Sequence, residues 1–155
     1  MKIAIGADHG GYKLKNKLVK FLEAGGHVVA DLGTHSSARC DYPPISYKVA
    51  RSVAQGLFSR GILLCKTGIG SSIVANKLPG IRAALCLTKL QACRSREHNN
   101  ANVLALAASY LGLKKACEIV DVWLKTEFSA EPRHAKRVRQ IRNIERKIRF
   151  HKEKS

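Results

Sequence analysis

The sequence has 155 residues, 45% of them hydrophobic and 25% charged, which fits one globular domain with a buried core. Its 28 basic and 11 acidic residues give a formal net charge of +17. No stretch approaches the roughly 20 apolar residues that a membrane span requires, and nothing resembles a secretion signal. We therefore expect a cytoplasmic protein without a membrane partner.

The chain has five cysteines, an odd number without CxxC spacing. This pattern favours reduced thiols over a disulfide framework or a zinc site. Cys86, Cys93 and Cys117 are interpreted as small buried hydrophobic residues.

Short apolar runs alternate with longer segments in which apolar residues recur at helical spacing. The runs predict five strands, at residues 2–6, 27–33, 61–65, 81–87 and 101–108. Segments with helical spacing lie between and after them, for example from Leu14 to Leu22 and over residues 114–128. Neither an internal repeat nor a low-complexity linker is evident.

Strands separated by helices predict a parallel sheet with helices on both faces. The expected fold is α/β, a three-layer αβα sandwich with a Rossmann-like, doubly wound, five-stranded parallel sheet. From the right-handed crossover rule we choose the strand order 2-1-3-4-5. We expect one domain over residues 1–149, including an extra C-terminal helix from about residue 134, and a basic tail over residues 150–155.

The C-terminal helix is expected to be amphipathic and basic. Its apolar residues Val138, Ile141, Ile144 and Ile148 recur at helical spacing. Such a stripe on a terminal helix usually packs on its own domain or on a partner subunit.

Polar residues follow the first and third predicted strands, which are neighbours in the chosen order. Asp8 and His9 follow the first strand, and Cys65 ends the third before the loop "KTGIGSS". In this fold class, ligands bind at the switch point between two such strands. The sequence therefore predicts a site there, although Asp8 alone could be a helix N-cap.

The loop after Cys65 does not match a Walker A motif or a dinucleotide fingerprint, because the lysine and the third glycine are missing. It remains a general cradle for an anion, in which backbone N–H groups precede a helix. A thiol before a helix N-terminus and beside Lys66 is expected to form the thiolate readily. The alternative for Cys65 is a small hydrophobic residue at the end of a strand.

"REHNNANV" places His98 and Asn99 just before the fifth strand. This is the far end of a parallel sheet from the predicted site, so a catalytic His98 would serve the site of a second chain. The alternative is a helix C-terminal cap. "PRHAKRVR" places Arg133, His134 and Arg137 on one helix face, suited to binding phosphate or simply solvated.

These motifs together resemble the ribose-5-phosphate isomerase B family, which includes the galactose-6-phosphate and allose-6-phosphate isomerases. The segments that carry the resemblance span Lys2 to about Arg146: "GADHGGY", "DLGTHSS", "DYP", "CKTGIGSSIVANK", "GIRAA", "REHNNANVLAL", and "RH" followed by Arg137. It implies interconversion of ribose 5-phosphate and ribulose 5-phosphate through a cis-enediolate, without metal or cofactor. It also implies a homodimer with shared active sites; a tetramer is left open.

The resemblance implies a role for each matching residue. Cys65 would be the base that moves a proton between C1 and C2, with Thr67 assisting. Asp8 and His98 would open the cyclic sugar. The backbone of Gly68, Ile69, Gly70 and Ser71 would stabilise the enediolate. His9, Arg133, His134 and Arg137 would hold the phosphate, and Tyr42 and Asn99 would line the sugar site.

Two positions depart from the family pattern. Lys66 stands where many relatives have glycine, and Ser109 stands near the position of an arginine that contacts phosphate in some relatives. Three alternatives remain open. One is a hexose-6-phosphate isomerase, and another is a nucleic-acid-binding protein on an inactive scaffold, suggested by the charge but without a recognised motif. The third is a redox protein that uses the Cys65 thiol, although no resolving cysteine lies nearby in sequence. Nucleic acid is not the partner that we expect.

Overall fold

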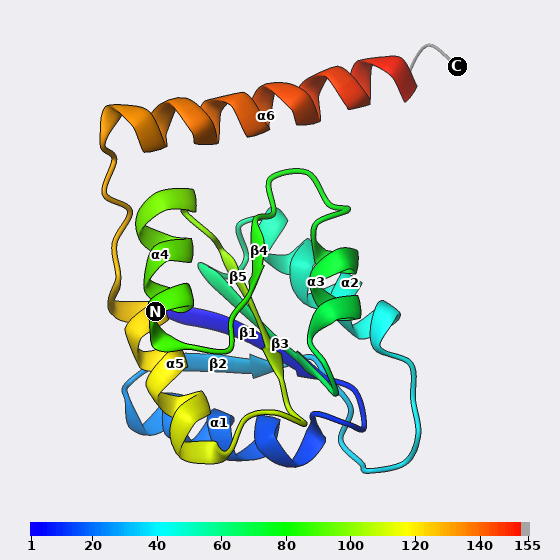
Figure 1. The fold of residues 1–155 in the computed structure, drawn as a ribbon. Coiled ribbons are helices and arrows are strands. Elements are labelled where there is room, and N and C mark those ends of the chain that lie inside the picture. The colour runs from blue at the N-terminus through cyan, green and yellow to red at the C-terminus, as the bar shows by residue number, and fades with distance from the viewer. Residues whose placement is uncertain (153–155) are drawn as a thin grey trace.

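The computed structural model describes the backbone of residues 1–152 and the side chains of residues 1–148. The elements alternate along the chain from β1 to α6, as drawn in Figure 1. They are β1 (Lys2–Ala7), α1 (Tyr12–Ala24), β2 (Val28–Asp31), α2 (Tyr42–Ala54), β3 (Arg60–Cys65), α3 (Ile69–Ala75), β4 (Ala83–Leu85), α4 (Lys89–Asn99), β5 (Val103–Ala107), α5 (Leu113–Lys125) and α6 (Pro132–Lys152). No helix in the described part of the chain is long and apolar enough to cross a membrane.

The five strands form one parallel sheet between two helical layers, so the predicted αβα sandwich is confirmed. Alternate residues of each strand point to opposite faces. On one face Ile62 and Leu104 pack with Leu18 of α1 and Trp123 of α5. On the other, Leu63 packs in a cluster that includes residues of α2 and α3. The core therefore lies on both faces of the sheet, as the doubly wound prediction requires.

The strand order is β2-β1-β3-β5-β4, so the predicted order 2-1-3-4-5 is wrong at its last two positions. Burial explains the difference. Every residue of β5 is fully buried, and this continuous apolar run pairs with both β3 and β4. Strand β4 has three residues, only partly buried, and suits the edge. The prediction that β1 and β3 are neighbours is confirmed by their register, which pairs Ala7 with Leu64.

The outer side of β4 is closed by a side chain. Asn76, which follows α3, donates from Nδ2 to the carbonyl of Ala83 at 2.9 Å and accepts from the N–H of Ala83 at 2.8 Å. These two bonds reproduce those of a neighbouring strand. They cover part of an edge that could otherwise pair with another chain.

Helix α6 lies across one end of the molecule, beyond α4 (Figure 1). It begins at Pro132, two residues earlier than predicted, because proline is favoured in the first turn of a helix. It continues to Lys152, so residues 150–152 of the predicted tail are helical; the remaining three lie outside the described residues. Val138 is buried, whereas Ile144 and Ile148 are more than half exposed.

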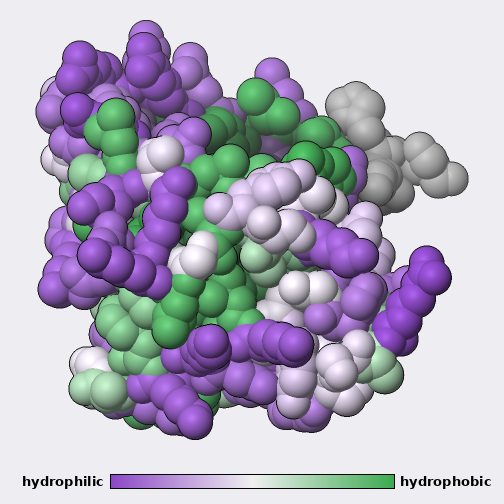
Figure 2. Space-filling model, turned by 60° about the horizontal axis from the view of Figure 1, so that its bottom comes forward, coloured by the Kyte–Doolittle hydropathy of each residue, from purple (hydrophilic) through white to green (hydrophobic). Residues whose placement is uncertain are grey.

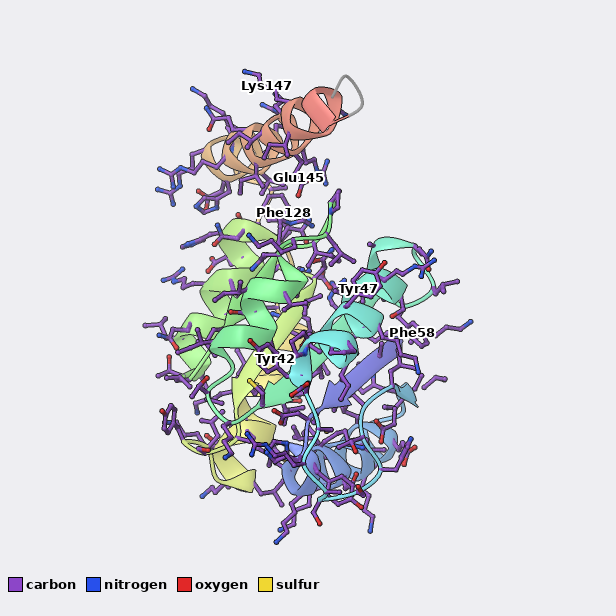
Figure 3. All side chains as sticks on the ribbon, turned by 90° about the vertical axis from the view of Figure 1, so that its right-hand side faces the viewer. Tyr42, Tyr47, Phe58, Phe128, Glu145 and Lys147 are labelled. Atoms are coloured by element: carbon purple, nitrogen blue, oxygen red, sulfur yellow. The ribbon has the colours of Figure 1, made fainter. Side chains whose placement is uncertain are left out.

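Figure 3 shows Glu145 pointing from α6 toward the body of the protein and Lys147 pointing away. Glu145 accepts a hydrogen bond from the N–H of Gly80 at 3.1 Å, just before β4. A cavity of about 390 Å³ lies beneath the helix, lined by Ile141, Ile144 and residues of β4 and α4. The second half of α6 therefore covers a hollow instead of a packed core. On the face drawn in Figure 2, hydrophilic residues surround a hydrophobic strip.

Candidate active site

The loops after β1 and β3 meet at the carboxyl edge of the sheet. The N–H of Asp8 donates to the carbonyl of Leu64 at 3.3 Å, which joins the loop after β1 to the end of β3. A cavity of about 460 Å³ opens there, and eight residues line it: Asp8, Tyr42, Cys65, Lys66, Thr67, Ile69, Gly70 and Ile73. Six of these were among the site residues predicted from the sequence, and Lys66 and Ile73 are additions.

Cys65 ends β3 and is only 4% exposed. Its Sγ accepts a hydrogen bond from the N–H of Gly68 at 3.1 Å. Gly68 has a φ of +72°, and a Cβ added there would lie 2.5 Å from Leu85 Cδ1. Only glycine suits both the left-handed backbone and this close approach. The turn therefore depends on Gly68 to direct an N–H group at the thiol.

The other cysteines have different surroundings. Burial raises the pKa of the Cys86 thiol to about 11 and also raises the pKa of Cys117. Both are therefore held as neutral thiols at neutral pH. Cys65 is the cysteine that lines the cavity with a backbone donor on its sulfur.

Loop N–H groups follow the thiol. The N–H of Ile69 lies 3.4 Å from Thr67 Oγ1. The first helical hydrogen bond of α3 runs from the N–H of Ser72 to the carbonyl of Gly68. Within the described residues, the N–H groups of Gly70 and Ser71, which come just before it, have no backbone acceptor. The ring of Tyr42, at the start of α2, lies against Gly70, where a Cβ would be 2.4 Å from Tyr42 Cζ. Two free donors thus lie beside a tyrosine at the cavity.

Asp8 is 6% exposed, and its Oδ1 accepts a hydrogen bond from the N–H of Gly11 at 3.1 Å. This bond orders the turn before α1, but the N-cap of that helix is Gly11 and has no side-chain cap, so the N-cap alternative for Asp8 is wrong. His9 is held by the loop before α2, since its Nδ1 lies 3.0 Å from the carbonyl oxygen of Cys40 and 3.2 Å from its nitrogen. The other carboxylate oxygen of Asp8, Oδ2, has no hydrogen-bond partner among the described residues, and neither has Nε2 of His9.

Lys66 fits the loop without strain. Its φ is not in the left-handed region. Among the described non-glycine residues, Asn100 and Ala130 are the ones with a positive φ. Lys66 Cγ lies 2.6 Å from where a Cβ on Gly10 would be, so its stem crosses toward the loop after β1. The side chain is exposed at the cavity and adds a cation there.

The remaining predicted residues form a second group, away from this cavity. His98 and Asn99 end α4, and Arg133, His134 and Arg137 lie in the first turns of α6. The rings of His98 and His134 are in contact, with centroids 4.2 Å apart and planes inclined by 35°. None of these five residues lines the cavity at Cys65. Figure 3 agrees, because Tyr42 lies well away from α6.

The second group has mixed exposure. Arg133 is exposed, with its Nε 2.9 Å from Glu131 Oε2, and Arg137 is exposed without an ion-pair partner in the described part of the chain. His134 is only 3% exposed. His98 lies beside Arg94 and Glu97, which sequence reasoning did not single out because they look like ordinary charges on an exposed helix.

A family model described as Ribose/Galactose Isomerase matches residues 3–141. The chain is 47% identical over 146 residues to ribose-5-phosphate isomerase B of Escherichia coli, covering 94% of this chain and 97% of that one. The chain belongs to the ribose-5-phosphate isomerase B family.

Two further relatives give the fold of one solved structure and a second stated substrate. A structure of ribose-5-phosphate isomerase B from Clostridium thermocellum superposes with a TM-score of 0.93 at 53% identity, covering 96% of this chain and 99% of that one. A D-erythrulose-4-phosphate isomerase of Pectobacterium atrosepticum is 44% identical over 129 residues, covering 83% of this chain and 85% of its own. The resemblance inferred from the sequence is therefore confirmed at the level of family.

Proposed function

We propose that this protein interconverts ribose 5-phosphate and ribulose 5-phosphate by proton transfer through a cis-enediolate, with Cys65 as the base and no metal. Relatives that cover nearly the whole chain support the reaction class. The observation that carries the mechanism is Cys65 in a cavity, with its sulfur accepting the N–H of Gly68. That N–H group is directed at the sulfur atom that takes up and returns the proton.

The first step opens the cyclic sugar. Asp8 and His98 act as acid and base, one taking the proton of the anomeric hydroxyl while the other protonates the ring oxygen. Asp8 is suited to this because its second carboxylate oxygen has no partner among the described residues. The product is the open-chain aldose, in which C2 carries an acidic proton beside the C1 carbonyl.

The second step moves two protons. The Cys65 thiolate removes the proton from C2, the electrons of that bond pass to O1, and the enediolate forms. The thiol then returns the proton to C1, while Thr67 helps transfer the hydroxyl proton between O2 and O1. In the loop from Gly68 to Ser71, the free N–H groups of Gly70 and Ser71 stabilise the developing oxyanion, and such donors are worth about 3–4 kcal/mol each in other enzymes.

Binding groups surround these residues. Tyr42 and Asn99 line the sugar, and His9, Arg133 and Arg137 bind the phosphate. Guanidinium groups suit this task because their paired N–H donors match phosphate oxygens. The net charge of +17 favours the approach of an anionic substrate.

We also propose a homodimer in which each chain completes the site of the other. His98, Asn99 and the arginines of α6 lie away from the cavity at Cys65, so within one chain they cannot act on the same sugar. The exposed apolar residues of α6, Ile144 and Ile148, provide a surface that a second copy would cover.

The test is conversion of ribose 5-phosphate by the purified protein, with Cys65→Ser, which replaces the thiol by a weaker base, and with a chelator present. Turnover that resists the chelator and falls at least about a hundredfold in the variant supports the scheme. A tetrose 4-phosphate and a hexose 6-phosphate are tested in parallel, because one relative acts on erythrulose 4-phosphate. The nucleic-acid-binding alternative has no support among the relatives reported above.

A further inference from the structure

The contact between His98 and His134 joins two helices that are far apart in sequence. His98 lies near the end of α4 and His134 near the start of α6, with ring centroids 4.2 Å apart. The two rings differ in exposure: the His98 side chain is 33% exposed, whereas His134 is 3% exposed. His134 therefore lies beneath His98, and the upper ring is the one that a ligand can reach.

The segment before α6 and the last turn of α4 hold His134 in place. Ser129 Oγ lies 2.8 Å from His134 Nδ1, and the N–H of His134 donates to the carbonyl of Glu131 at 2.9 Å. The N–H of Ser129 in turn donates to the carbonyl of Glu97 at 3.1 Å, which ties this segment to the last turn of α4. The ring that supports His98 is thus attached to the same turn that carries His98.

The surroundings of the pair favour a neutral His134 ring and place a donor beside His98. Burial, and then the neighbouring His98 and Arg133, lower the pKa of His134. Arg94 Nη1 lies 3.3 Å from His98 Nε2. Because a guanidinium can only donate, that nitrogen accepts, which places the proton of a neutral His98 on Nδ1. Glu97 Oε2 holds Arg94 at 2.6 Å and so fixes the donor.

We propose that His134 is a positioning residue for His98: its buried ring is the platform that holds the His98 imidazole in place for opening the cyclic sugar. This inference rests on the proposed function, in which His98 acts on the ring of the substrate. It gives His134 a role different from the phosphate binding expected from the sequence, which falls to Arg133 and Arg137. A ring with Nδ1 engaged and almost no exposed surface suits support better than phosphate binding.

Two measurements separate ring opening from proton transfer. Conversion of ribose 5-phosphate needs both steps because that sugar is cyclic. Ribulose 5-phosphate is an open-chain ketose, since its O5 carries the phosphate and cannot close a five-membered ring. Exchange of its C1 proton for deuterium in D2O therefore needs only the Cys65 step.

The variants are His134→Ala, which removes the platform, and His134→Phe, which keeps a flat ring but loses the bond to Ser129. We expect His134→Ala to lower conversion of ribose 5-phosphate by about tenfold to a hundredfold, while C1 exchange stays within about twofold. His134→Phe should recover most of the conversion, because it restores the contact with His98.

Each other outcome overturns the inference. Equal loss of both activities in His134→Ala would mean that His134 only maintains the structure. Unchanged conversion would mean that His98 needs no platform, and failure of His134→Phe to recover activity would show that the ring contact is not the cause. If the wild-type protein shows neither conversion nor exchange, the proposed function fails, and not merely the role of His134.

Discussion

Cys65 and His98 lie at opposite ends of the strands of the parallel sheet. Cys65, the last residue of β3, pairs with Ala107, the last residue of β5, whereas His98 comes before β5 begins at Val103. In a parallel sheet the carboxyl ends of all strands lie at the same end of the sheet. Two residues expected to act on one sugar are thus separated in each chain, and a second chain is the simplest way to unite them.

This separation predicts complementation between two inactive variants. Cys65→Ala and His98→Asn should each be inactive alone. When the two are co-expressed, random pairing should restore about a quarter of wild-type activity, because half of the dimers are mixed and one of their two sites is intact. Turnover per dimer, measured after mixed dimers are isolated with two affinity tags, checks this. If each chain held a complete site, mixed dimers would remain inactive.

Gly68 should be far less tolerant of substitution than Gly80. Both have positive φ, +72° and +81°, but a Cβ on Gly68 would collide with Leu85 whereas nothing lies within 4 Å of one on Gly80. Gly80→Ala is therefore a matched control for backbone strain alone. We expect losses of about 3 kcal/mol for Gly68→Ala and about 1 kcal/mol for Gly80→Ala in the free energy of unfolding.

Chemical denaturation measures both glycine variants. Isomerase activity should fall in Gly68→Ala even where the protein is folded, because the N–H of Gly68 points at Cys65. Equal destabilisation by the two substitutions would contradict the close approach to Leu85.

The sequence predicted most of the fold because local signals were consistent. Short apolar runs predicted the strands. The position of the site followed from the prediction that β1 and β3 are neighbours in the sheet. The order of β4 and β5 could not be predicted in this way. Both segments look like apolar runs, and only three residues of the first form a strand, at an edge closed by Asn76.

The burial of His134 was also beyond local reasoning. "PRHAKRVR" looks like a solvated basic face, and only the packing of α6 on α4 makes its histidine, together with Val138, part of the interior. The loop geometry at Lys66 was likewise undetermined, because a sequence does not state the sign of φ. The structure places that residue outside the left-handed region.

The buried His134 predicts a loss of stability in mild acid. Burial lowers its pKa from the ordinary 6.5, so the unfolded chain takes up a proton before the folded one does. The stability that neutral His134 gives to the folded protein is fully present above pH 6.5. It is lost as the pH falls from 6.5 to the pKa of His134 in the folded protein. The charged groups around the pair are Arg94, Glu97, His98, Glu131, Arg133 and Arg137.

Denaturation midpoints between pH 7.5 and 5 measure this effect. In His134→Phe the fall with acid should be shallower than in the wild type, because the substitution removes the proton that only the unfolded chain binds. The remaining slope comes from the other titrating groups, which the two proteins share. Parallel curves would mean that His134 titrates alike in the folded and unfolded chain.

Asn76 should protect the edge of the sheet as well as stabilise it. Asn76→Ala removes both bonds to the backbone of Ala83, and we expect a loss of about 1–2 kcal/mol in the free energy of unfolding. Asn76→Asp keeps the acceptor for the N–H of Ala83 and loses the donor, so its loss should be intermediate. Because the uncovered strand could pair with another chain, Asn76→Ala should also aggregate more readily on mild heating, which light scattering would detect. Alanine and aspartate variants as stable and as soluble as the wild type would show that the edge of β4 is protected by other means.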